Sequence, residues 1–197
     1  EFQEMLSNIM TPELQEAMEQ LQEALSNMDP ENLSKALENF DFNLEEFESQ
    51  LDRFMDMFKL AQAEQMLNEL TKSIENMIEQ QSDLINEITN NSDNKNQLST
   101  KSNKQEQRFN NFENLLSDTQ NFTEQFSENI SNKLDSLTNC SDMKKSSTSL
   151  KETTKEINND NMEAAENSSN TTLNSLNEIS KNINEIKDEF LKESINE

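Results

Sequence analysis

Carboxylates are the most abundant groups in this chain that could do chemistry. Its 197 residues include 40 Asp and Glu and no histidine, so proton transfer would depend on carboxylates held in contrasting environments. Groups such as Glu45, Glu46 and Glu48 instead lie in amphipathic helical patterns that turn them toward water. The chain also has no glycine, which excludes a glycine-rich phosphate loop. We therefore expect no catalytic residue and no enzymatic activity.

Metal and cofactor sites lack their usual ligands. An EF-hand needs acidic ligands at alternating positions, a central glycine and a final glutamate, and the windows that start at Asp41 and Asp93 do not have this pattern. Cys140 is the only cysteine, so an intrachain disulfide and a cysteine-based metal site are excluded. Its neighbours offer no cation that would activate the thiol. We expect no metal ion and no cofactor.

The negative charge of the chain limits its partners. The formal net charge is −24, and residues 1–88 hold 21 acidic and four basic residues. Such a surface repels nucleic acid and anionic lipid headgroups, so we expect no nucleic-acid binding and no direct binding to anionic membranes. A solvated helix face is the simplest explanation of the charge, while a basic partner or weakly bound divalent cations remain open.

The N-terminal third carries clear helix signals. Thr11-Pro12 is an N-cap followed by proline at the first helical position, and Asp29-Pro30 repeats the device to end one helix and start a second. Asn43 and Glu46 resemble a capping box, which predicts a third helix start. Residues 1–42 are therefore expected to form short capped helices.

A long helix is expected over residues 43–88. Its apolar residues step by three and four, the spacing of a heptad seam, and the register shifts near residues 58–63. Together with the first helix, it supplies the candidate interaction seam, which we define as Leu14, Met18, Leu21, Leu25, Phe47, Leu51, Phe54, Phe58, Leu67, Leu70 and Ile74. The phenylalanines from Phe40 to Phe58 suggest a junction where the short helices dock, although an exposed remainder would bind another protein.

Two polar segments are expected to interrupt the second half. Residues 89–105 and 138–149 are rich in Asn, Ser and Lys, which favour turns, and the chain should reverse in the first of them. A second coiled-coil helix should cover 106–137, and C-terminal helices with a weak seam should cover 150–197, with a minor turn at Asn158-Asn159. Only 31% of the residues are hydrophobic. The predicted fold is all-α, with long amphipathic helices in antiparallel coiled-coil hairpins.

Several segments resemble an uncharacterised family of large, membrane-anchored bacterial proteins. The similar segments are 10–18 (MTPELQEAM), 25–33, 42–47, 60–65 and the spacing from Leu150 to Asn161-Met162-Glu163-Ala164-Ala165. The family carries N-terminal transmembrane helices and a long Glu/Gln/Met-rich helical region with no assigned activity. The resemblance implies that this chain is part of such a helical region and that its parent lies in the bacterial cell envelope. The first residue is Glu1, and we expect an internal segment of a longer protein.

Two classes of function remain at this point. The first is a structural scaffold or spacer that presents helix seams to the rest of its parent chain or to other protein chains. The alternative is a signalling coiled coil of the chemoreceptor kind, because residues 173–186 resemble the sequences of such helices. A phage-tail or secretion spacer is a further alternative. The predicted partners are proteins: copies of the chain or other helices of the parent.

Overall fold

The computed structural model describes residues 12–27, 30–90 and 94–196, apart from the side chains of 24–27, 30–33, 40–43, 46, 195 and 196. Every regular element within these ranges is an α-helix, which confirms the predicted all-α fold. The helices are α2 (Pro12–Asn27), α3 (Pro30–Asn90), α4 (Lys95–Thr123), α5 (Glu128–Thr138), α6 (Ser141–Asn158) and α7 (Met162–Asn196). The chain divides into two compact units, residues 1–61 and residues 62–197.

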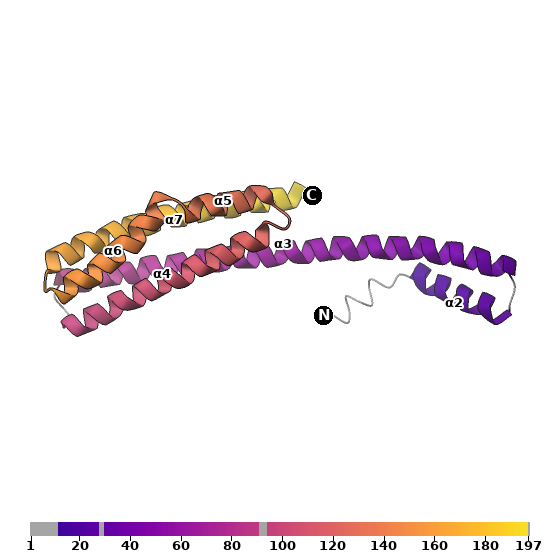
Figure 1. Cartoon of the computed structure of the whole chain (residues 1–197), viewed down its shortest axis with the longest axis horizontal. Helices are drawn as coiled ribbons and strands as arrows, with labels where there is room; N and C mark the ends of the chain where they lie inside the picture. Colours follow the sequence, from indigo (N-terminus) through magenta and orange to yellow (C-terminus); the bar gives the residue numbers. More distant parts are fainter. Residues whose placement is uncertain (1–11, 28–29, 91–93, 197) are drawn as a thin grey trace. The chain divides into compact units, whose positions relative to one another are not determined.

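In the first unit, α2 and the beginning of α3 form an antiparallel helical hairpin (Figure 1). The Asn39 side chain donates a hydrogen bond to Gln20 at 3.5 Å, and Leu14, Ala17 and Ala36 are buried. Both helices begin at the prolines that the sequence analysis selected, because proline is preorganised for the first turn and has no N–H to leave unpaired. Their predicted capping residues, Thr11 and Asp29, lie outside the described residues.

The helix start expected at Asn43 is wrong. α3 runs as one helix of 61 residues from Pro30 to Asn90, so the boundary between residues 42 and 43 separates no elements. A capping-box sequence offers the backbone an alternative to the helix, but it ends a helix only when the preceding turn is also lost. No proline or glycine lies between Pro30 and Asn90, and the helix therefore continues.

The second unit is an antiparallel four-helix arrangement (Figure 1). The last part of α3 and α4 form one hairpin, in which the Gln105 side chain donates to the Met77 carbonyl at 2.9 Å. α5 and α6 follow one another and together take the place of a third long helix. Both pack on α4 and α7. The Gln81 side chain of α3 donates to the Ser169 carbonyl of α7 at 3.2 Å, which closes the arrangement. The predicted antiparallel hairpins are confirmed.

The apolar faces of α3, α4, α5, α6 and α7 form the core of the second unit. On α3 the second register of the long helix is buried, as its spacing predicted: Ala63, Leu67, Leu70, Ile74, Met77, Leu84 and Ile88 are all at most 2% exposed. At one end, Leu84 and Ile88 pack with Leu98, Ile157 and Ala165. Burying these side chains contributes about 25 cal/mol per Å² of apolar surface removed from water, and this packing stabilises helices whose propensity alone is marginal.

Both predicted linkers are much shorter than expected. α4 begins at Lys95, and the Asn94 side chain caps it by accepting from the Gln97 N–H at 3.0 Å, so residues 95–105 of the expected 89–105 linker are helical. α6 begins at Ser141, so most of the expected 138–149 linker is also helical. The reason is tertiary packing: Leu98 in the first segment and Met143 in the second are buried in the core, and such burial stabilises helix where local propensity disfavours it.

One break was missed and one turn was predicted. The expected helix over 106–137 is interrupted at residues 124–127, where Ser127 caps α5 by accepting from the Ile130 N–H at 3.3 Å. The turn at Asn158-Asn159 is present between α6 and α7. Asp160 has a φ of 61° there, a left-handed conformation that glycine usually supplies and that Asp tolerates better than most residues.

Candidate functional site

The candidate seam separates into a buried part and a surface part. Leu67, Leu70 and Ile74 have no exposed surface and belong to the core of the second unit. In the first unit Leu14 is buried, Leu21, Phe47 and Phe54 are half-buried, and Met18, Leu51 and Phe58 are exposed. The Leu25 side chain lies outside the described residues. Residues of one sequence pattern therefore have two different environments.

Three of the exposed large apolar residues of α3 lie on one face of the helix, and we call them the α3 stripe: Leu51, Met55 and Phe58. Their exposed fractions are 36%, 48% and 60%. They are spaced i, i+4 and i+7, so they lie on one face of the helix. Phe47 and Phe54 lie on the same face and are half-buried. Large apolar side chains exposed together on one face are typical of a surface that packs against another protein.

Carboxylates border the α3 stripe along one edge. Glu48 and Asp52 are exposed, and at roughly 100° per residue they lie beside Leu51 and Met55 on the helix surface. Asp56 accepts from Lys59 at 3.1 Å, so one carboxylate of this edge is partly neutralised. Arg53 lies toward the opposite face. The stripe is therefore an apolar surface with an acidic border.

A polar layer crosses the core of the second unit. Gln81 and Gln105 are at most 1% exposed, and Gln105 donates to Gln81 Oε1 at 3.3 Å as well as to the Met77 carbonyl. One turn before Gln105 on α4, the Ser102 hydroxyl is 2.8 Å from that of Thr154, and Thr154 donates to Glu106 at 2.5 Å. Each of these groups has a partner, so the layer avoids most of the penalty for burying polar atoms.

Hydroxyl groups continue this polarity between α6 and α7. Thr172 donates to Ser149 at 2.8 Å, and Ser169 donates to Thr153 at 3.3 Å. Ser146 Oγ is buried without a hydrogen-bond partner. The sequence analysis assigned Ser146 and Ser149 to the polar linker 138–149 and the later residues to a weak seam, and it selected none of them. Their spacing could have identified them, because Ser146, Ser149 and Thr153 follow the same three-and-four steps as an apolar seam.

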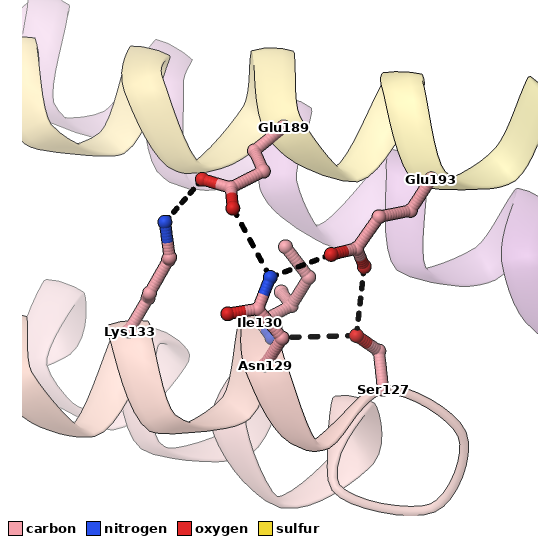
Figure 2. Close-up of polar contacts among 6 residues, drawn as sticks. All are labelled: Ser127, Asn129, Ile130, Lys133, Glu189 and Glu193. Atoms are coloured by element: carbon pink, nitrogen blue, oxygen red, sulfur yellow. Dashed lines mark hydrogen bonds and ion pairs between the residues drawn. The ribbon is translucent and has the colours of Figure 1, made fainter.

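Two carboxylates of α7 hold the N-terminal turn of α5 (Figure 2). Glu193 accepts from Ser127 at 3.0 Å and from Asn129 at 2.5 Å, and Glu189 accepts from Asn129 at 3.1 Å and pairs with Lys133. The hydrogen bond from Lys133, followed by the one from Asn129, lowers the pKa of the Glu189 carboxyl below its ordinary value. The cluster fixes α5 beside α7 after the break at 124–127.

Two further polar groups lie outside this cluster. Burial raises the pKa of the Glu113 carboxyl on α4, and Lys151 on α6 opposes that shift. Cys140 lies on a shallow groove of about 330 Å³ with Lys133 and Glu189, and its Sγ accepts from the Met143 N–H at 3.4 Å as the cap of α6. Among the described residues, no three Cys, Asp or Glu are grouped as metal ligands.

No protein-family model, curated protein or solved structure matches the chain. Within the described ranges, no helix has the length and apolar character that crossing a membrane requires. The candidate functional surface is the α3 stripe, which the exposure and the helical spacing of its residues define.

Proposed function

We propose that the chain is a non-enzymatic structural segment of a larger bacterial envelope protein. In this role, the second unit is a stable helical bundle, and the first unit carries a helix seam for packing against other helices. The envelope location and the membrane-anchored parent are proposed from the resemblance of residues 10–18, 25–33, 42–47 and 60–65 to such a family. The parent chain or a partner chain would supply the packing helix.

The observation that carries this proposal is the contrast along α3. Leu67, Leu70 and Ile74 are fully buried, whereas Leu51 and Phe58 on the same helix are exposed. An apolar face exposed to water costs free energy, because each large side chain would gain roughly 1.5–3 kcal/mol on burial. A row of large apolar side chains that stays exposed on the first unit is suited to packing with another helix.

A comparison of stabilities tests the proposal. Leu70→Ala should lower the free energy of unfolding by about 2–5 kcal/mol, because it leaves a cavity in the core. Replacing Leu51 and Phe58 together by Ser should change it by less than about 1 kcal/mol, because exposed positions contribute little to the isolated chain. Urea denaturation followed by far-UV circular dichroism measures both. Equal destabilisation would show that the α3 stripe serves the internal packing of this chain, and the proposal would fail.

A signalling coiled coil of the chemoreceptor kind is the second candidate. The buried polar layer around Gln81, Gln105 and Thr154 favours it, because a hydrogen-bonded layer in a bundle core is one way to give two packings similar free energies. The sequence of the parent protein on both sides of this chain separates the candidates. A sensor module and a glycine-containing hairpin tip would favour signalling, whereas paired N-terminal membrane spans would favour the envelope scaffold.

A further inference from the structure

We infer that the α3 stripe (Leu51, Met55 and Phe58) is the docking site of a basic amphipathic helix from a partner protein. This inference rests on the proposed function, since it names the chemistry of the helix that a presented seam would bind. Three observations carry it: the shape of the stripe, the extent of α2 and the charge at the border of the stripe.

The stripe has the shape of a surface that binds a helix. Its residues at i, i+4 and i+7 cover two turns, about 10 Å along the axis, and Phe47 and Phe54 widen it on the same face. Recognition of an amphipathic helix uses apolar anchors at this spacing on both partners. The Met55 side chain is unbranched and adapts to the shape of an incoming apolar group.

The described residues of α2 lie opposite the part of α3 that precedes the stripe. Gln20 lies opposite Asn39, and both helices advance 1.5 Å per residue in opposite directions. Pro12, the first residue of α2, therefore lies opposite about residue 47 of α3. Leu14 and Ala17 are buried in the hairpin, while Leu51 and Phe58 lie farther along α3. No described residue of α2 therefore lies opposite the α3 stripe.

The charge at the border favours a basic partner. Residues 44–59 contain five acidic residues and two basic residues, and Glu48 and Asp52 are exposed beside the stripe. A helix with Lys or Arg along its edges would pair with these carboxylates while its apolar face covers Phe58. A second copy of this chain would instead bring two acidic borders together, and like charges in an interface oppose association.

Peptide binding to the full chain tests the inference. The probe is a dye-labelled three-heptad helical peptide with Leu at the core positions and Lys at the flanking positions, and its control carries Glu in place of Lys. The Lys peptide should bind and the Glu peptide should not, as measured by fluorescence anisotropy. Leu51→Ser with Phe58→Ser should weaken binding about tenfold or more, because both anchors lose their apolar contact.

Matched charge variants separate docking from general attraction. Neutralising the border with Glu48→Gln and Asp52→Asn should weaken binding several-fold. Neutralising Glu19 and Glu23 of α2 in the same way changes the net charge equally and should leave affinity within about twofold. Equal weakening by the two pairs would overturn the inference, because binding would then depend only on the total charge of the chain.

Other occupants of the stripe give different results. Self-association that sedimentation detects and that Phe58→Ser abolishes would identify a second copy as the occupant. Tighter peptide binding in an Ile9→Ser variant would identify the first residues of this chain as competitors. Either result overturns the inference. If the doubly substituted stripe variant unfolds easily, the proposed function itself fails, whereas a stable variant together with no peptide binding overturns the basic partner alone.

Discussion

The hydrogen bond between Gln105 and Gln81 provides the sharpest test of how the bundle core is held together. Gln105 Nε2 donates to Gln81 Oε1 at 3.3 Å, and both side chains are at most 1% exposed. Gln105→Leu keeps a similar volume but removes this donor, so Gln81 retains a buried acceptor without a partner. An unpaired buried polar group costs about 1–3 kcal/mol, which for a chain of this size corresponds to a decrease in Tm of roughly 2–12 °C.

The double substitution gives the prediction its second arm. With Gln81→Leu and Gln105→Leu together, no amide of this pair remains unpaired, and replacing both partners by apolar groups of similar shape is nearly neutral. The double variant should therefore be more stable than the Gln105→Leu single variant. Urea denaturation of all four chains, followed by far-UV circular dichroism, gives the coupling free energy of the pair.

The matched control is Gln65→Leu on the same helix. Gln65 is exposed and donates to Glu69 at 2.9 Å, so its loss should change stability by no more than about 0.5 kcal/mol. If Gln105→Leu were as mild as this control, the polar layer would not be a desolvated part of the core. If the double variant lost the sum of the two single effects, the two amides would act independently and the reasoning would be refuted.

Three further predictions concern charge and backbone. The lowered pKa of Glu189 means that its carboxylate contributes stability above its ordinary value of 4.5, and this contribution is lost as the pH falls through the lower folded-state pKa. The stability difference between the native chain and Glu189→Gln should thus be present at neutral pH and disappear in acid; a difference that grows on acidification would contradict the role of the Lys133 bond. Raising salt from low to physiological concentration should increase Tm, because it screens repulsion within a chain of net charge −24; a fall in Tm would show that attractive pairs such as Lys101–Glu87 at 2.6 Å outweigh it. Asp160→Val should cost about 1–2 kcal/mol because of the positive φ, whereas Asp160→Asn, measured by the same denaturation, should be nearly neutral.

Local signals in the sequence were sufficient for several features of the fold. Proline at the first position of a helix marks the starts of α2 and α3. Its ring fixes φ at a helical value, and this effect needs no contact with distant segments. The spacing from Leu67 to Ile88 identified a helix face that the core buries. The turn at Asn158-Asn159 was also predictable, since these side chains favour turn conformations without any long-range contact.

The polar elements show where local reasoning fails. Residues 95–105 and 141–149 have the composition of loops, yet they are helical because Ser102, Gln105 and Ser149 pack and form hydrogen bonds with distant segments. The break at residues 124–127 escaped prediction for the opposite reason. Continuous helical spacing from Phe109 to Leu137 allows one straight helix, and only the packing of α5 on both α4 and α7 accounts for the reversal.

The candidate surface depends on both kinds of information. Sequence spacing alone determined that Leu51, Phe58, Leu67 and Leu70 lie on apolar faces of a long helix, since the helical repeat is a property of the backbone. Tertiary structure decided that Leu67 and Leu70 are buried while Leu51 and Phe58 are exposed. The physical reason is that burial needs a second surface, and whether distant segments cover a given turn of α3 is not encoded in the spacing of that turn.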